Sequence, residues 1–330
     1  MDNSLHLSVS PHIHSGRSTS RIMLDVLIAL SPAAIAGTII FGFRSLLVIL
    51  ACVASCVAFE FLFNLVTKRR QTIGDLSAAV TGLLLALNLP ANIPIWQCVI
   101  GSAFAILLVK CIFGGIGANL VNPAITARVF MIIAFGATMA SVATPVIVDT
   151  VASATPLVDI AAGNTPSLMS LLLGTTGGAI GETCAIALIA GFVYLLVRRV
   201  ITWHVPVAFV GTVFIFSFFM EGGWDFATVA AQILSGEILA EGSCLMNATA
   251  LILSGGLLIG AIFMATDYVT SPPTWSGKLI FGVGAGLITI LIRYFGSYPE
   301  GVSFAILFMN IVNPYICKLT AHKIFGGKKK

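Results

Sequence analysis

A dense group of hydroxyl and carboxylate side chains in one loop is the first feature of the sequence that could support chemistry. Thr150, Ser153 and Thr155 lie between Asp149 and Asp159, just before a proline. A hydroxyl becomes a nucleophile when a neighbouring base such as His or Lys takes its proton. No His or Lys lies near this loop in the sequence. The loop therefore lacks a base of its own that could turn one of these hydroxyls into a nucleophile.

A glycine-rich turn followed by polar side chains is a second candidate site. Residues 114–117 read Gly-Gly-Ile-Gly, Asn119 follows, and Asn122 can cap a helix that starts at Pro123. Backbone N–H groups at such a positive helix end can hold an anionic or electron-rich ligand. Close packing of membrane helices is the alternative explanation for the glycines. Arg128, one turn into the same helix, either pairs with an acid, contacts a ligand or extends to the membrane interface.

The elements that position these residues are membrane helices. Charged residues make up 9% of the 330 residues and hydrophobic residues 58%, with a mean hydropathy of +1.04. Ordinary soluble domains contain about 25% charged residues, so a soluble globule is excluded. A spanning helix needs roughly 20 mainly apolar residues, and the runs here do not alternate as outer-membrane strands do. The predicted fold is an all-α integral membrane protein with about ten spans, some of them short or broken. The spans are 22–42, 46–66, 74–89, 95–113, 123–141, 178–197, 204–220, 246–266, 278–294 and 301–317.

The distribution of charge predicts how the chain is threaded. With the N-terminus inside, the inner face collects every Lys and Arg except Arg44 and Arg293. The long outer loops 142–177 and 221–245 contain acids but no Lys or Arg. The net charge of +4 thus reflects topology and does not imply nucleic-acid binding. Both termini are expected inside, Thr155 outside, and no removable signal peptide is recognised.

Two similar segments predict an inverted repeat. The run from Gly82 to Trp96 resembles the run from Gly260 to Trp275, and each precedes an apolar helix, a turn with glycine and a further helix. Five spans per half is an odd number, so the halves are expected to face opposite ways, as in transporters whose broken helices meet near the midplane. Five parts follow: a polar cytoplasmic segment (1–20), a first membrane repeat (21–141), an extracytoplasmic loop (142–177), a second repeat (178–320) and a basic cytoplasmic tail (321–330).

Four acids fall within or beside the predicted spans: Asp25, Glu60, Asp75 and Glu182. Ionisable groups within a membrane are candidates for an ion path. All four lie near predicted helix ends, where water is close, so solvated side chains are the alternative.

Two motifs resemble those of a known family of membrane redox proteins. The run Asp149-Thr150-Val151-Ala152-Ser153-Ala154-Thr155 is similar to the flavinylation motif shared by the D subunit of the Rnf complex and the B subunit of the sodium-pumping NADH:quinone reductase. It departs from that motif at Thr150 and Ala152. Residues 114–124, followed by Arg128, resemble the family's GG-x-G-x-N-x-x-NPA segment. The resemblance covers the chain from about residue 20, and the short N-terminal extension favours the Rnf branch.

The resemblance implies FMN joined to Thr155 through a phosphoester. Asp149, Ser153 and Ala154 then belong to the motif that a separate flavinyltransferase recognises outside the cytoplasm. Such a transferase supplies the chemistry, so the loop needs no general base of its own. The flavin carries out the redox chemistry, and Thr155 is its tether.

A second flavin, noncovalent riboflavin or FMN, is implied within the helix bundle. By resemblance, its candidate ligands are Asn119, Asn122, Arg128 and Asp267, since Asn and Asp can hydrogen-bond a flavin edge or ribityl chain. Simple helix capping is the alternative for Asn122, and a loop acid at the inner face is the alternative for Asp267.

The implied function is a membrane electron-transfer subunit of an ion-translocating ferredoxin:NAD⁺ oxidoreductase that couples electron flow to Na⁺ or H⁺ transport. Such a subunit is not expected to be active alone. It works with other membrane and peripheral subunits, one of them also flavinylated, in the bacterial cytoplasmic membrane. The alternative is a small-solute channel or transporter, because an inverted five-helix repeat also resembles urea-channel architecture. Fold alone does not decide between these functions.

Overall fold

The computed structural model describes residues 18–141, 143–146, 155–162, 164, 166–223, 243–296 and 300–321. Within these ranges the regular structure is helical, and the strand-like pairing consists of isolated bridges that join Pro90 with Ala179 and Ala143 with Gly178. The all-α character predicted from the sequence is confirmed for this part of the chain.

The N-terminal half forms helices separated by short breaks. They are α1 (Thr19–Phe41), α2 (Phe43–Val66), the 3₁₀ turn η1 (Ile73–Asp75), α3 (Ser77–Leu87), α4 (Ile95–Ala103) with its π-helical continuation η2 (Phe104–Cys111), α5 (Pro123–Ala134) and α6 (Gly136–Met139). The start of α5 follows the predicted capping pattern. Asn122 Oδ1 accepts hydrogen bonds from the N–H groups of Ala124 (3.0 Å) and Ile125 (3.4 Å), and Pro123 occupies the first helical position.

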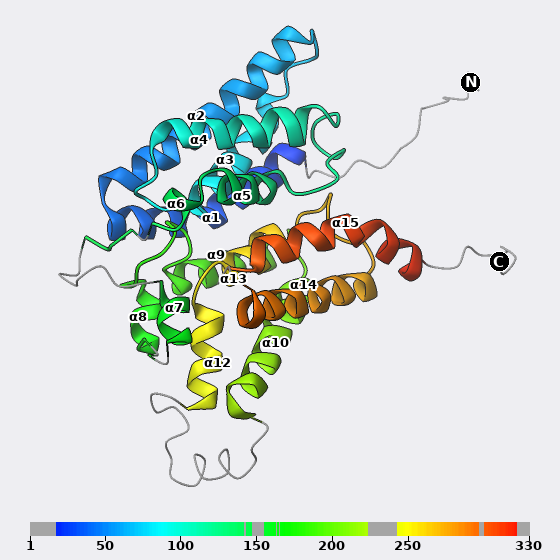
Figure 1. The fold of residues 1–330 in the computed structure, drawn as a ribbon. Coiled ribbons are helices and arrows are strands. Elements are labelled where there is room, and N and C mark those ends of the chain that lie inside the picture. The colour runs from blue at the N-terminus through cyan, green and yellow to red at the C-terminus, as the bar shows by residue number, and fades with distance from the viewer. Residues whose placement is uncertain are drawn as a thin grey trace, which may run out of the picture.

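The C-terminal half begins with two short helices and continues with longer ones. They are α7 (Pro156–Ala161), α8 (Leu168–Leu173), α9 (Ala185–Val197), α10 (His204–Phe218) with its continuation η3 (Phe219–Gly223), α12 (Cys244–Leu253), α13 (Leu257–Ile259) with its continuation η4 (Gly260–Met264), α14 (Trp275–Phe295) and α15 (Val302–Thr320). In Figure 1 the blue and cyan helices of the first half lie above the orange and red helices of the second, and α7 and α8 lie to the left of α12.

Five helices of the described chain are long and apolar enough to cross a membrane: α1, α2, α10 together with its continuation η3, α14 and α15. A sixth span is formed if α12 and the α13–η4 helix count as one, since they are bent by 61° at a short break. Shorter apolar helices cover 77–87, 95–111, 123–134 and 185–197. The prediction of ten spans in two inverted repeats stays a prediction, because these four helices are shorter than a full span.

Non-helical segments replace parts of two predicted helices. The predicted span 178–197 becomes helical only at Ala185, and the predicted span 246–266 is interrupted after Leu253. The residues before α9 instead run antiparallel to the end of α3, where the N–H of Ile180 bonds the carbonyl of Leu89 (3.1 Å) and that of Gly181 bonds Leu87 (2.8 Å). Short and broken helices were predicted, but the predicted bounds of these two were wrong. Before α9, tertiary backbone pairing satisfies the polar groups in place of a helix.

Glycines allow the closest helix contacts. A Cβ atom on Gly191 of α9 would lie 2.3 Å from the carbonyl oxygen of Ala29 on α1, and one on Gly82 of α3 would lie 2.8 Å from that of Cys52 on α2. Real Cβ atoms do not approach an oxygen this closely, so both positions require glycine. Small residues of this kind are typical of membrane-helix interfaces.

Candidate functional site

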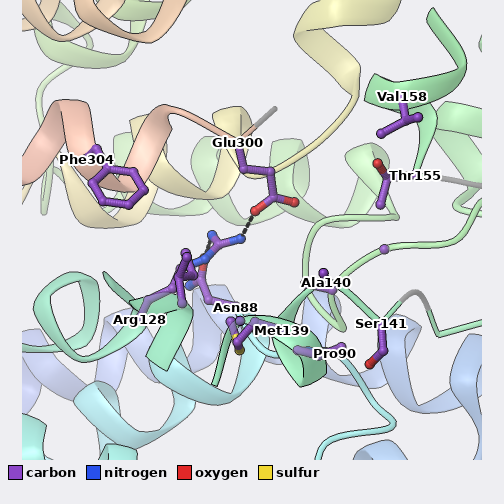
Figure 2. A pocket seen from close by; sticks show the side chains of 14 residues that line it. Asn88, Pro90, Arg128, Met139, Ala140, Ser141, Thr155, Val158, Glu300 and Phe304 are labelled. Carbon is purple, nitrogen blue, oxygen red and sulfur yellow. Dashed lines mark hydrogen bonds and ion pairs between the residues drawn. The ribbon is translucent and has the colours of Figure 1, made fainter. Parts of the chain in front are cut away.

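Thr155 and Arg128 line the same cavity. This Thr155 cavity has a volume of about 350 Å³ and is also lined by Asn88, Glu300 and Phe304, so that it joins segments from both halves of the chain. Figure 2 shows Thr155 on one side and Arg128, directed at Glu300, on the other. Ligand pockets commonly measure roughly 300–1,000 Å³. The Thr155 cavity therefore has the size of a small-molecule site.

The hydroxyl of Thr155 is not used to cap the helix that follows it. Thr155 is the N-cap of α7, with φ −62° and ψ 148°, and Pro156 takes the first helical position. Threonine at an N-cap commonly accepts a hydrogen bond from the helix backbone, but this side chain accepts none. Instead, the backbone carbonyl of Thr155 accepts hydrogen bonds from the N–H groups of Val158 (2.8 Å) and Asp159 (3.1 Å). The side chain thus lines the cavity with its hydroxyl uncommitted to the helix.

Arg128 is the charged centre of the cavity wall. Its Nη2 atom pairs with Glu182 Oε1 at 2.7 Å and also with Glu300 Oε2, and its Nη1 donates to Asn88 Oδ1. Arg128 and Glu182 are both buried, at 3% and 4% exposed, whereas the Glu300 side chain is 27% exposed. The Nε–H of Arg128 has no hydrogen-bond partner among the described residues. A buried donor of this kind is available to a ligand.

These contacts decide between the alternatives for Arg128. Its side chain is buried and pairs with acids, so the alternative of a side chain that extends to the membrane interface was wrong. The solvated alternative for Glu182 was wrong for the same reason. The predicted place of Arg128 among the cations of the inner face stays a prediction. A buried charge is tolerated when an opposite charge and hydrogen bonds balance it, and here each group supplies that balance for the other.

A second cavity brings together Asn119, Asn122 and Asp267. This Asn119 cavity measures about 120 Å³ and is also lined by Lys110 and Tyr268. Asn119 Oδ1 is buried without a hydrogen-bond partner in the described chain. The structure therefore divides the predicted flavin ligands, because Arg128 lines the Thr155 cavity while the other three line the Asn119 cavity.

Protein groups already engage two of the residues in the Asn119 cavity. Asn122 caps α5 with its oxygen, as described above, and its Nδ2 donates to the carbonyl of Met264 at 3.4 Å. The carboxylate of Asp267 accepts the hydroxyl of Thr270 at 3.1 Å and the N–H of Val269 at 3.5 Å. The capping interpretation of Asn122 is confirmed, while a flavin contact by either residue stays a prediction.

A buried ion pair borders the Asn119 cavity. Lys110 Nζ lies 2.9 Å from Glu60 Oε2 and donates to Ser77 Oγ at 2.6 Å, and Thr72 donates to Glu60 Oε1 at 2.6 Å. Lys110 and Glu60 are each 2% exposed. The solvated alternative for Glu60 was wrong, because the two charges neutralise each other inside the bundle. The predicted place of Lys110 at the inner face stays a prediction.

Three of the predicted site residues, Asp149, Ser153 and Ala154, lie outside the described residues. Three residues that the structure adds to the site were not predicted as ligands: Asn88, Glu182 and Glu300. A buried acid within a membrane segment was the available signal for Glu182. Glu300 lies within the run Tyr298-Pro299-Glu300-Gly301, and its pairing with Arg128, 172 residues away in the sequence, depends on the fold. Groups of three or more His, Cys, Asp or Glu arranged to hold a metal ion are absent from the described part of the chain.

Comparison with known proteins identifies relatives over nearly the whole chain. A sequence model of the NQR2, RnfD, RnfE family matches residues 6–326. The chain is 41% identical to the D subunit of the Na⁺-translocating ferredoxin:NAD⁺ oxidoreductase complex of Acetobacterium woodii, over 99% of this chain and 98% of that protein. It is 38% identical to the D subunit of the proton-translocating ferredoxin:NAD⁺ oxidoreductase complex of Clostridium ljungdahlii, over 99% and 98%. It is 34% identical to the D subunit of the ion-translocating oxidoreductase complex of Salmonella typhi, over 98% and 99%.

Proposed function

The chain belongs to the NQR2, RnfD, RnfE family, and we propose that it is the membrane electron-transfer subunit of an ion-translocating ferredoxin:NAD⁺ oxidoreductase complex. Similarity to three subunits of such complexes along nearly their full length supports this role. Two of these relatives are named for different ions, Na⁺ and the proton, so family membership leaves the coupling ion open. We place the subunit in the bacterial cytoplasmic membrane with the other subunits of the complex as partners.

We further propose that Thr155 carries covalent FMN, attached by a separate flavinyltransferase. The observation that carries this proposal is the uncommitted Thr155 hydroxyl on a cavity of about 350 Å³ with a buried arginine in its wall. Asp149, Ser153 and Ala154 complete the motif of the attachment loop. The residues of the cavity fit a flavin, because its wall is mainly apolar and the unpartnered Nε–H of Arg128 supplies a donor for a polar ring edge.

When bound, a flavin supplies one- and two-electron redox chemistry. The protein's part is to hold and surround it. Thr155 fixes one end, and Phe304 and the neighbouring apolar side chains line the cavity against the apolar part of the flavin. Arg128 is held in place by Asn88, Glu182 and Glu300, so its donors are oriented before a ligand arrives. The Nε–H of Arg128, which has no partner among the described residues, is thus an oriented donor for a polar edge of the flavin.

A denaturing gel tests the proposed function against a solute channel. The chain is co-expressed with the flavinyltransferase of its natural source, denatured and examined for flavin fluorescence in the gel. A fluorescent band at the mass of this subunit, absent when the transferase is omitted, is the expected result. A chain from the natural source with no covalent flavin would contradict the redox role and favour a channel for small solutes.

We also propose a second, noncovalent flavin at the Asn119 cavity, which must widen to hold it. At about 120 Å³ the cavity is below the usual size of a ligand site, so bound flavin requires it to widen. Replacing Asn119 by leucine removes its unpartnered acceptor. We expect the total flavin per subunit, measured by absorbance after acid extraction and digestion, to fall while gel fluorescence stays unchanged. Equal total flavin in wild type and N119L would rule out Asn119 as a ligand.

The predicted topology is tested by cysteine labelling in intact cells. Ala161, at the end of α7, and Arg70, between α2 and η1, are both exposed. We expect Ala161→Cys to react with a membrane-impermeant maleimide in intact cells. Arg70→Cys should react only after the membrane is permeabilised. The unsubstituted chain provides the background from its own seven cysteines. Labelling of Arg70→Cys but not Ala161→Cys in intact cells would reverse the orientation and place Thr155 inside.

A further inference from the structure

The turn that joins η2 to α5 forms part of the wall of the Asn119 cavity. This glycine turn, residues 112–121, contributes Ile116 and Asn119 to the lining, and the rest of the wall comes from helices and from the loops after α9 and η4. The cavity measures about 120 Å³, whereas ligand sites commonly measure roughly 300–1,000 Å³. A part of its wall therefore has to move before the cavity can hold a molecule the size of a flavin.

Two glycines of this turn are required for backbone conformation and not for packing. Gly115 and Gly117 have left-handed φ angles of +96° and +88°. A Cβ atom on either of them would meet no heavy atom of the described residues within 4 Å, apart from its neighbours in the chain. Close packing, the alternative explanation for the glycines of this segment, therefore does not apply to these two. Their role is the backbone freedom that a side chain would remove.

The backbone of the glycine turn is bonded only locally. The N–H of Gly115 bonds the carbonyl of Lys110 at the end of η2 (3.0 Å), and the N–H of Ala118 bonds that of Gly115 (3.3 Å). Within the described part of the chain, no backbone hydrogen bond joins the turn to another helix. Several of its apolar side chains are more than half exposed: Ile112, Phe113 and Leu120. Segments with local hydrogen bonds and little buried surface open at the lowest free energy.

Both ends of the glycine turn are fixed to the bundle. Lys110, just before the turn, forms the buried ion pair with Glu60. Asn122, just after it, caps α5 and donates to the carbonyl of Met264. A segment held at both ends can move only about hinges that lie between them. Glycine suits a hinge because it adopts left-handed and right-handed φ angles about equally well.

We propose that residues 112–121 form a lid, hinged at Gly115 and Gly117, that closes the empty Asn119 cavity and moves outward to admit the noncovalent flavin. This inference rests on the proposed second flavin, and it explains how that site reaches the size it requires. Ile116 and Asn119 move with the lid, so the cavity enlarges while the helices around it keep their packing. Asn119 Oδ1, which has no partner among the described residues, then accepts a hydrogen bond from the flavin.

Alanine at Gly117 tests the lid through the affinity for riboflavin. The Cβ atom of alanine is strained in the left-handed conformation of the closed lid, and the strain is released when the hinge leaves that conformation. The population of the open form therefore rises, and the apparent dissociation constant falls with it. We expect riboflavin to bind the purified complex, depleted of noncovalent flavin, about tenfold more tightly in Gly117→Ala than in wild type. Equilibrium dialysis measures the dissociation constant.

Gly211→Ala is the matched control. Gly211 lies in α10, its φ angle is not left-handed, and an added Cβ atom would likewise meet no heavy atom of the described residues within 4 Å. The control thus adds the same methyl group without the strain, and we expect it to bind riboflavin like wild type. Gly115→Ala repeats the test at the other hinge and should also bind riboflavin more tightly.

Labelling of a residue inside the cavity measures opening of the lid without flavin. Thr81 of α3 lines the Asn119 cavity and is 8% exposed. We expect N-ethylmaleimide to modify Thr81→Cys about tenfold faster when Gly117 is also replaced by alanine, and added riboflavin to slow the reaction. Mass spectrometry of the peptide that contains position 81 separates this label from the native cysteines.

The lid is overturned if labelling rates and riboflavin affinities are the same with glycine and alanine at both hinges. Loss of the assembled complex in both hinge variants would overturn it as well, because only a rigid turn needs the left-handed conformation at all times. If riboflavin binds to none of the proteins, the proposed second flavin is wrong, while the labelling rate still reports whether the lid opens.

Discussion

Replacing Thr155 by alanine is expected to abolish covalent flavin on this subunit and to reduce ferredoxin-dependent NAD⁺ reduction by the complex to background. The substitution removes the hydroxyl that forms the phosphoester and little else. The side chain makes no capping hydrogen bond. The backbone carbonyl of Thr155, which accepts hydrogen bonds from the first turn of α7, is retained. The folded subunit should therefore accumulate normally. Gel fluorescence and an immunoblot of the same lanes separate loss of flavin from loss of protein.

Thr175→Ala is the matched control for Thr155→Ala. Thr175 lies in the same predicted extracytoplasmic region, follows α8 and is exposed. It lines none of the cavities described. We expect full flavin fluorescence and full activity from this variant. A fluorescent band that persists in Thr155→Ala would show that another residue carries the flavin.

Replacing Arg128 by methionine is expected to destabilise the subunit by about 3–5 kcal/mol, the usual cost of removing one partner from a buried ion pair. Methionine fills part of the space but leaves the carboxylates of Glu182 and Glu300 without their shared partner. Asn88 Oδ1 also loses the hydrogen bond that it accepts from Arg128. The thermal unfolding temperature of the purified complex in detergent measures this effect, together with the yield of assembled complex.

A triple variant distinguishes unpaired charge from lost packing. Arg128→Met combined with Glu182→Gln and Glu300→Gln removes the buried charges together, so most of the lost stability should return. Lys278→Met is the control, because Lys278 is only half-buried and bonds only the hydroxyl of Thr202 in the contacts described. If Arg128→Met is as stable as wild type, the cluster does not hold the Thr155 cavity together.

Local signals in the sequence were enough to predict some of this architecture. Asn122 followed by Pro123 specifies a helix start through interactions within a few residues, and the structure has that cap. The end of α3 at Leu87, just before Asn88 and Pro90, follows from proline's incompatibility with a continuing helix. The low charge content likewise predicts long apolar helices without any knowledge of tertiary structure.

Tertiary pairing explains what the sequence did not reveal. The segment before α9 is apolar enough for a helix, but its N–H groups bond the carbonyls of Leu87 and Leu89 from the other half of the chain. A charge count treats each ion separately, so it did not reveal that Lys110 and Arg128 are buried in ion pairs. Their partners, Glu60 for Lys110 and Glu182 with Glu300 for Arg128, are brought near only by the folded bundle.

The composition of the candidate site likewise depends on tertiary packing. Resemblance predicted Thr155 and Arg128 separately, one for a covalent flavin and the other for a noncovalent one. The structure places both on one cavity and leaves Asn119 and Asp267 on another. Which polar residues share a cavity depends on helix packing over long sequence separations, and sequence spacing carries no direct information about it.

Tandem mass spectrometry of the proteolytic peptide that contains Thr155 tests whether FMN is attached to this residue. The complex is purified from its natural source, digested and searched for peptides that carry flavin. The expected spectrum has FMN in phosphoester linkage on Thr155, with the fragment masses of the neighbouring Ser153 unchanged. Unmodified Thr155 in a fully recovered peptide, or FMN on another residue of this chain, would contradict the account.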